Sequence, residues 1–253
     1  MKNSIFLPKS IEVIICSGGG VGTTFFIEEI KRYKSTNDPH DLDGLKHLPL
    51  PPISLNKNLK AIFVLGDPLI ACASLFRRDF HSQQSVVMNR FLLRKRLISA
   101  SMNLEHYAQE KFDGLLFDRQ LMNWKTRPTA YDILFVKYEK IHDNLKVIQE
   151  FLGLPDEFVV KFPKKIDRRT DLSALTEKAK NGLSDKYGAL KNKIDELDDV
   201  AIKKGSASGY TSIKYFFSNA FTFTMDYLSI IFVEILKKFF PGMVARTKQI
   251  FTK

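Results

Sequence analysis

The chain has 253 residues and an ordinary globular composition, 44% hydrophobic and 26% charged, which excludes a disordered or fibrous protein. Its net charge is +11, and residues 160–253 carry 18 basic but only 10 acidic side chains, so most of the excess lies in the C-terminal part. A basic surface attracts nucleotides, sulfated or phosphorylated ligands, anionic lipid or nucleic acid, and composition alone does not choose among them.

The two cysteines, Cys16 and Cys72, both lie in apolar runs. Two cysteines in such runs do not make a disulfide framework, so we expect buried, reduced thiols. No signal peptide is visible, because the apolar run 11–16 is short and leads straight into glycines. These features predict a cytoplasmic protein.

Strand patterns alternate with helix patterns along the chain. Apolar, β-branched runs predict strands at residues 10–16, 60–65 and 132–137, with a further short strand at 114–117. Helical spacing or composition predicts helices at residues 23–33, 68–78, 85–111 and 141–152, and a charged helical region at 170–204. This alternation predicts an α/β fold with a mostly parallel central sheet flanked by helices.

The chain divides at a flexible stretch, GSASG, at residues 205–209. We expect an α/β domain over residues 1–204, then a hinge and an aromatic, basic, helical segment over residues 205–253. Residues 215–233 form a run of 19 with one charge, Asp226. A membrane span, an interfacial helix on an anionic membrane made by residues 210–253, and helices packed on the domain or in a dimer interface all remain open.

A glycine-rich loop joins the first predicted strand to the first predicted helix. Glycines let backbone N–H groups turn toward a phosphate, and the N-terminus of a helix adds partial positive charge. The loop therefore predicts a nucleotide phosphate site; a tight turn without a ligand is the alternative. Its residues are Ser17, Gly18, Gly19, Gly20, Val21, Gly22, Thr23 and Thr24.

Two common phosphate loops fit this sequence poorly. The Walker pattern needs Lys directly before Ser or Thr, and that position is Thr23. A dinucleotide fingerprint would need Gly or Ala at the same position. An ATPase and a dinucleotide-binding enzyme are therefore disfavoured.

Four segments, in order, resemble the sulfotransferases that use 3′-phosphoadenosine 5′-phosphosulfate (PAPS). They span more than half of the chain: the loop end Gly22-Thr23-Thr24-Phe25, the stretch Lys46-His47-Leu48-Pro49-Leu50, residues 60–74 (KAIFVLGDPLIACAS) and residues 133–154 (ILFVKYEKIHDNLKVIQEFLGL). The chain departs from the family at three positions. It has Gly20 and Val21 where the family has Lys and Ser, and Gly66 where the family has Arg. The family's late Arg-Lys-Gly motif has only a faint echo in Lys203-Lys204-Gly205.

The resemblance implies a P-loop-like architecture, PAPS as co-substrate, no metal, and transfer of a sulfuryl group to a hydroxyl of a carbohydrate or small metabolite. It implies His47 as general base, Lys46 steadying the leaving oxygen, and Phe25 as part of the nucleotide site. Ser74 would bind the 3′-phosphate, and Arg77 and Arg78 would supply charge.

Alternatives remain at this stage. His40, Asp41 or Asp43 could be the base, although they better suit turn formation. For Trp124, a role as a core anchor is favoured over a role as a platform on which the nucleotide's base stacks. A nucleotide-binding or membrane-peripheral protein that lost the chemistry is the second function. A nucleic-acid-binding module has only the basic charge in its favour, so we expect no nucleic-acid partner.

Overall fold

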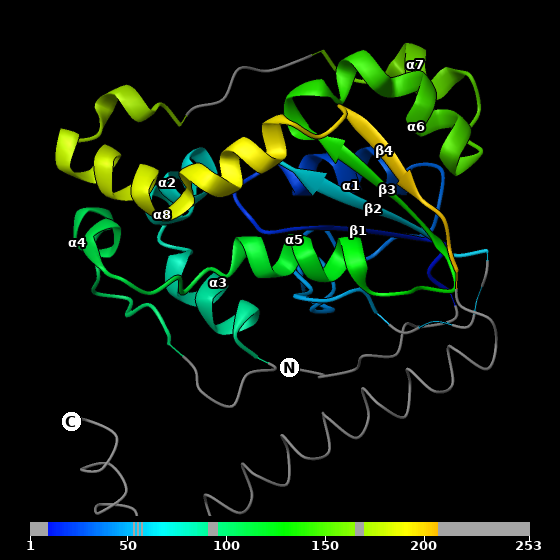
Figure 1. Ribbon diagram of the computed structural model, residues 1–253. Coiled ribbons are helices and arrows are strands. Elements are labelled where there is room, and N and C mark those ends of the chain that lie inside the picture. The colour runs from blue at the N-terminus through cyan, green and yellow to red at the C-terminus, as the bar shows by residue number, and fades with distance from the viewer. Residues whose placement is uncertain are drawn as a thin grey trace, which may run out of the picture.

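The computed structural model describes residues 10–52, 54, 56, 58–90, 96–164 and 170–206 (Figure 1). Their strands form one four-stranded sheet in the order β1-β2-β3-β4, with bounds β1 Val13–Ser17, β2 Lys60–Leu65, β3 Asp132–Lys137 and β4 Val200–Lys203. β1, β2 and β3 are parallel, and β4 runs antiparallel to β3. The fold is therefore α/β with a mostly parallel sheet.

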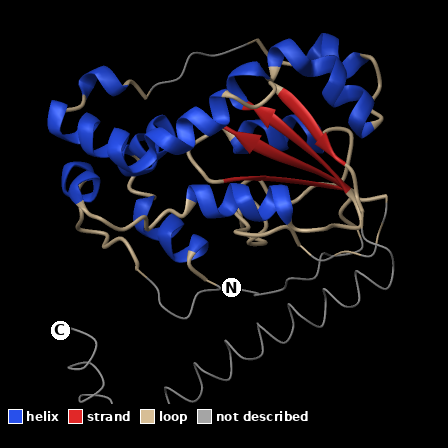
Figure 2. Ribbon diagram, in the orientation of Figure 1, coloured by secondary structure: helices blue, strands red, loops and turns tan. Residues whose placement is uncertain are grey.

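Helices flank this sheet and also gather beyond its carboxyl edge (Figures 1 and 2). They are α1 Thr23–Lys31, α2 Pro68–Arg77, α3 His81–Met88, α4 Leu104–Gln109, α5 Phe117–Thr126, α6 Leu145–Leu152, α7 Glu157–Lys161 and α8 Glu177–Asp195, with short 3₁₀ turns at Tyr138–Lys140, His142–Asn144 and Leu172–Ala174. α5 covers one face of the sheet and α1 and α6 the other, whereas α2, α3, α4 and α8 lie past the strand ends (Figure 1).

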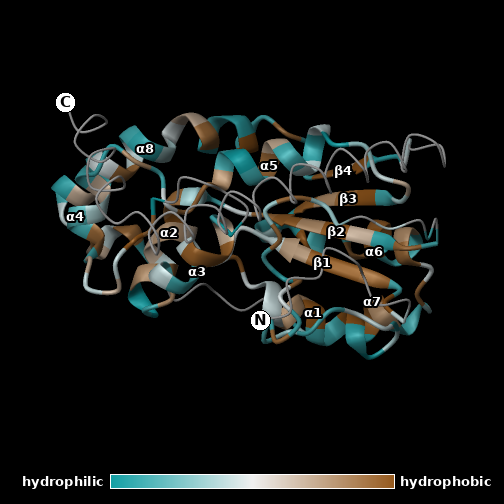
Figure 3. Ribbon diagram, turned by 90° about the horizontal axis from the view of Figure 1, so that it is seen from below, coloured by the Kyte–Doolittle hydropathy of each residue, from teal (hydrophilic) through white to brown (hydrophobic). Residues whose placement is uncertain are grey.

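The core is built on both faces of the buried strands. Cys16, Phe63 and Phe135 are lateral neighbours in the register, so they share one face of the sheet. On that face the ring of Phe63 lies 5.1 Å from the ring of Trp124 in α5. Cys16 and Cys72 are buried free thiols, as expected. Figure 3 shows the strands as the most hydrophobic part of the ribbon.

Local chemistry fixes where two of the helices start and end. Asp67 caps α2 by accepting hydrogen bonds from the backbone N–H groups of Leu69 and Ile70, and Pro68 occupies the first turn, where no N–H is needed. Gly153 ends α6 in the left-handed conformation, with φ of 64°. α2 thus begins at residue 68 and α6 ends at residue 152, as the sequence predicted.

The long loop after α1 is held against β1 by a side chain. The amide of Asn37 accepts from the N–H of Ile15 at 2.8 Å and donates to the carbonyl of the same residue at 3.0 Å. Asn37 is fully buried. Further along the loop, the N–H of Ser17 donates to the carbonyl of Lys46 at 3.1 Å. The loop therefore runs beside the outer edge of β1 and reaches its carboxyl end.

Three sequence-based predictions of secondary structure are wrong. Residues 114–117 form no strand: the carbonyl of Gly114 accepts from the side chains of Ser85 and Asn89, and α5 begins directly afterwards. The described part of residues 85–111 is not one helix, since α3 ends at Met88 and α4 starts at Leu104. Residues 170–204 are helical in α8 but not throughout, because residues 200–203 pair with the edge of β3 and form β4.

The predicted hinge at 205–209 and the aromatic segment beyond it lie, from residue 207 on, outside the described residues. The proposed membrane contact through residues 210–253 falls on this part. Within the described ranges, none of the helices has the length and hydropathy that crossing a bilayer requires.

Candidate functional site

A pocket opens at the carboxyl edge of the sheet, between the glycine loop, the long loop after α1, and α2 with α3. We call it the loop pocket. Its empty volume is about 820 Å³, which includes space open to solvent. It is lined by Gly20, Val21, Gly22, Thr23, Thr24, Pro39, His40, Asp41, Lys46, His47, Leu75, Arg78, Phe80, Gln83, Gln84 and Val87.

The glycine loop is held in one conformation by side chains around it. The hydroxyls of Ser17 and Thr23 are 2.6 Å apart, and the N–H of Gly19 donates to the Ser17 hydroxyl at 3.2 Å. From α3, the amide of Gln84 donates to the carbonyl of Gly18 at 2.8 Å. α1 then begins at Thr23, directly after Gly22, and no side chain caps its first N–H groups. These groups are available to a bound anion.

Gly20 stands where the sulfotransferase resemblance implies a lysine, and the packing explains the difference. Its φ is +73°, a left-handed value that favours glycine. A Cβ at this position would lie 2.5 Å from the carbonyl oxygen of Ala71 in α2. In this conformation the loop therefore has no room for a side chain at position 20.

Lys46 brings an ammonium group to the loop from a different segment. Its Nζ donates to the hydroxyl of Thr24, in the first turn of α1, and to the carbonyl of Pro39 at 2.6 Å. Both partners are neutral. Burial lowers the pKa of Lys46 from its ordinary value, and the nearby Asp41 carboxylate opposes that shift. The lysine is thus a buried cation beside the loop.

His47 lies next to Lys46 and faces the same pocket. Its Nδ1 is 3.0 Å from the carbonyl of Ser17. A carbonyl only accepts hydrogen bonds, so in the neutral ring Nδ1 carries the proton and Nε2 holds the lone pair. Burial lowers the pKa of His47 to about 4, against the opposing effect of the Ser17 carbonyl. At neutral pH the ring is uncharged and can accept a proton at Nε2.

Arg78 supplies a second cation from the C-terminal end of α2. Its Nε donates to the carbonyl of Ser74 at 3.1 Å, and its guanidinium lies 5.4 Å from the ring centroid of Phe80. Burial, followed by the neighbouring Arg77, lowers its pKa. Within the described part of the chain it forms no ion pair with a carboxylate. A half-buried cation of this kind attracts an anionic ligand.

The structure leaves other candidate residues outside the loop pocket. Ser74 is buried in α2, and Arg77 points elsewhere, since its Nε donates to the Thr170 hydroxyl at 3.3 Å. Phe25 packs edge-to-face on Phe162, with centroids 5.6 Å apart. Lys203 is the last residue of β4 and pairs with Ile133 at the start of β3, so Lys203-Lys204-Gly205 lies at the sheet edge opposite the loop.

The acidic residues of the long loop build its turns. Asp38 accepts from the N–H groups of His40 and Leu42, and Asp43 accepts from that of Leu45. Asp41 accepts from the N–H of Lys46 at 2.8 Å. Burial raises the pKa values of Asp41 and Asp43. These bonds are consistent with the turn-forming role expected of Asp41 and Asp43.

Trp124 serves as a core anchor. Its side chain is fully buried, and its Nε1 donates to the carbonyl of Leu48 at 3.0 Å. The amide of Gln120 donates to the same carbonyl at 2.8 Å and to that of Ser17 at 3.1 Å. α5 therefore fixes the Lys46-to-Leu48 stretch against the end of β1, and so positions His47.

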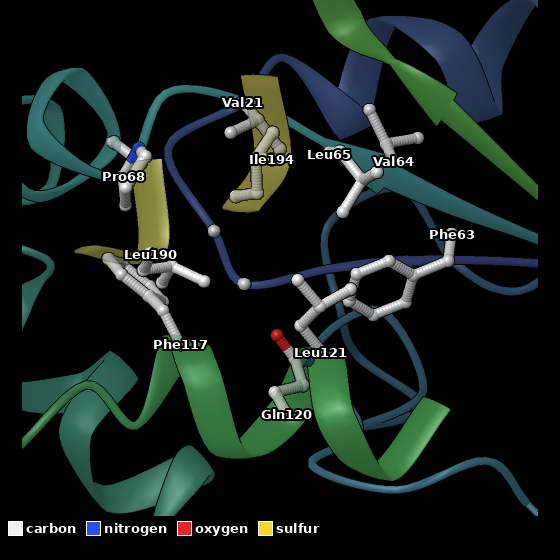
Figure 4. A pocket seen from close by; sticks show the side chains of 14 residues that line it. Val21, Phe63, Val64, Leu65, Pro68, Phe117, Gln120, Leu121, Leu190 and Ile194 are labelled. Carbon is white, nitrogen blue, oxygen red and sulfur yellow. The ribbon is translucent and has the colours of Figure 1, made fainter. Parts of the chain in front are cut away.

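A second, smaller cavity of about 340 Å³ lies on the other side of the glycine loop. Figure 4 shows side chains from β2, α5 and α8 around it, among them Phe63, Leu121 and Ile194. Gly66, which stands where the resemblance implies an arginine, also lines it. Its described lining contains no cationic side chain.

The contribution of α3 to the loop pocket was not predicted from the sequence. Phe80, Gln83, Gln84 and Val87 all line it. Their spacing places them on one face of a helix. That spacing was present in the sequence, but only the fold shows that this face meets the glycine loop.

Comparisons with known proteins add no relative: no family model, curated protein or solved structure matches the chain. Among the described residues, no three His, Cys, Asp or Glu side chains are grouped closely enough to hold a metal ion.

Proposed function

We propose that this protein is a sulfotransferase that binds PAPS in the loop pocket and passes its sulfuryl group to a hydroxyl. One observation carries the proposal. The Lys46 ammonium reaches the first turn of α1 at Thr24, in the same pocket as the neutral imidazole of His47. An uncapped helix N-terminus, a buried cation and an adjacent base are the groups that sulfuryl transfer needs.

Lys46 takes over the electrostatic role that a loop lysine would have. Position 20 has no room for a side chain, whereas Lys46 brings its charge to Thr24 from outside the loop. Its partners are a hydroxyl and a carbonyl, so its charge is not neutralised by direct ion pairing. We infer that Lys46 stabilises the negative charge that develops on the leaving oxygen.

His47 is the proposed general base. With Nδ1 donating to Ser17, its Nε2 is the ring atom that can take the acceptor's proton. A pKa of about 4 makes this a weak base in the ligand-free protein. An anion bound beside it favours the charged imidazolium and raises that pKa. Arg78 would hold the phosphate end of the ligand. The proposal also includes a P-loop-like architecture with PAPS bound at the glycine loop.

Isothermal titration of the full chain with 3′-phosphoadenosine 5′-phosphate (PAP) tests the proposal, with AMP, ATP and NAD as comparison ligands. We expect PAP to bind more tightly than AMP. Lys46→Gln should weaken PAP binding by about tenfold or more, because it removes a charge-assisted contact. Lys31→Gln, at the exposed far end of α1, is the matched control and should bind as the parent does. Equal affinity in both variants would count against the role of Lys46.

A second function is a nucleotide-binding protein without transfer activity. The arrangement of Ser74, Arg77 and Gly66 favours it, because none of them brings a 3′-phosphate contact into the loop pocket. It predicts binding that is indifferent to the 3′-phosphate and no transfer of label from ³⁵S-labelled PAPS to any hydroxyl compound. Labelled product that disappears in His47→Gln would exclude this second function.

A further inference from the structure

The face of α3 that closes the loop pocket has no part in the chemistry proposed above. It consists of Phe80, just before the helix, with Gln83, Gln84 and Val87. We call it the α3 face. The start of α1, Lys46 and His47 line the same pocket. A molecule that presents a hydroxyl to His47 would therefore share this pocket with the α3 face.

The groups on this face differ in how far they are already used. Gln84 is buried, and its amide nitrogen donates a hydrogen bond to the carbonyl of Gly18. Gln83 is exposed, and its amide makes no hydrogen bond with another described residue. The ring of Phe80 is 49% exposed, with Arg78 nearby. One amide and one aromatic ring are thus open to a ligand.

We propose that the α3 face recognises the acceptor, and that the acceptor is a neutral, hydroxyl-rich ring of the carbohydrate class; this rests on the proposed sulfuryl transfer for its chemistry. An amide both donates and accepts hydrogen bonds, which matches a hydroxyl. An aromatic ring offers a flat apolar surface to the C–H groups of a sugar ring. His40 and Asp41 continue the polar lining at the same pocket.

The shape and lining of the pocket argue against a phenolic or other flat apolar acceptor. Such a ligand needs an enclosed slot of mainly apolar side chains. The α2 and α3 side of the pocket combines three apolar residues with three polar ones, namely Leu75, Phe80 and Val87 with Arg78, Gln83 and Gln84. The pocket is also partly open to solvent. A polar ring with several hydroxyls fits this mixed lining better.

The test is saturation-transfer NMR on the full chain, with and without PAP. The probes are methyl α-glucoside, methyl α-mannoside, methyl β-galactoside and N-acetylglucosamine, with 4-nitrophenol as the apolar comparison. We expect at least one sugar to bind and 4-nitrophenol not to displace it. Gln83→Ala should weaken sugar binding by about fivefold or more, which corresponds to one lost hydrogen bond, and leave PAP binding unchanged.

Val86→Ala is the matched control, because Val86 is exposed on α3 but does not line the pocket. Phe80→Leu keeps an apolar side chain and should also weaken sugar binding. The inference is overturned if no sugar binds, if 4-nitrophenol displaces the sugar, or if Gln83→Ala and Val86→Ala behave alike. PAP binding without sugar binding would remove this inference alone. Sugar binding that depends on Gln83, in a protein that ignores PAP, would instead remove the proposed transfer activity.

Discussion

Three glycines allow the packing at position 20 to be tested quantitatively. Gly20→Ala combines a left-handed backbone, which costs a non-glycine residue about 1–2 kcal/mol, with a Cβ placed 2.5 Å from the Ala71 carbonyl oxygen. Overpacking of a close contact costs about 1–3 kcal/mol. We therefore expect Gly20→Ala to lower the free energy of unfolding by about 2–5 kcal/mol.

Two other glycines separate these contributions. Gly153 has φ of +64°, but a Cβ there meets nothing within 4 Å, so Gly153→Ala should cost only the backbone strain, about 1–2 kcal/mol. Gly188, inside α8, also has open space around it, and Gly188→Ala should stabilise the protein by about 0.5–1 kcal/mol.

Urea unfolding followed by circular dichroism measures all three changes, compared at equal m-values. The reasoning is refuted if Gly20→Ala destabilises no more than Gly153→Ala, because the contact with α2 would then be easily relieved. In that case the absence of a lysine at position 20 would need another explanation. The inference that Lys46 replaces a lysine of the loop would then lose its steric support. Gly20→Lys should be worse than Gly20→Ala for the same steric reason.

Two further predictions concern stability and its pH dependence. The pKa of His47 is about 4 in the folded protein and about 6.5 when unfolded, so the unfolded chain takes up more protons between these values and stability falls as the pH drops through this window. His47→Gln should remove about 1–3 kcal/mol of that loss, measured by urea unfolding at pH 7 and pH 4.5. The raised pKa values of Asp41 and Asp43 act in the opposite direction, but they do so in both proteins and cancel in the comparison. If stability changed with pH to the same extent in the variant and the parent, the lowered pKa of His47 would be contradicted. Asn37→Leu should cost about 2–5 kcal/mol, because the buried N–H and carbonyl of Ile15 lose their partner; a cost below about 1 kcal/mol would show that β1 finds another edge partner.

Much of the frame of this protein follows from short stretches of sequence. β-branched runs predicted β1, β2 and β3 because such residues favour extended, buried backbone. The glycines after β1 predicted the turn, and three of them adopt positive φ. Lys46 and His47 became candidates through the resemblance of residues 46–50 to a stretch of the sulfotransferase family. Each of these inferences depends on a few neighbouring residues.

Other features depend on contacts that no local pattern contains. The side chains of Ser85 and Asn89 donate to the carbonyl of Gly114. Residues 114–117 therefore form no strand, although their composition favours one. The packing of α2 turns Arg78 into the pocket and leaves Arg77 to bond Thr170. Neighbouring residues on a helix point in directions about 100° apart, so the sequence could not choose between these two arginines.

The sequence by itself determined the strands β1, β2 and β3, the positions of α1 and α2, and where a phosphate loop could form. Only the tertiary structure decided that Lys46 reaches Thr24, that position 20 has no room for a side chain, and that α3 closes the pocket. The physical reason is one of range. Backbone preference and hydrophobic period act over a few residues, whereas a site is assembled by the burial of apolar faces that brings distant segments together.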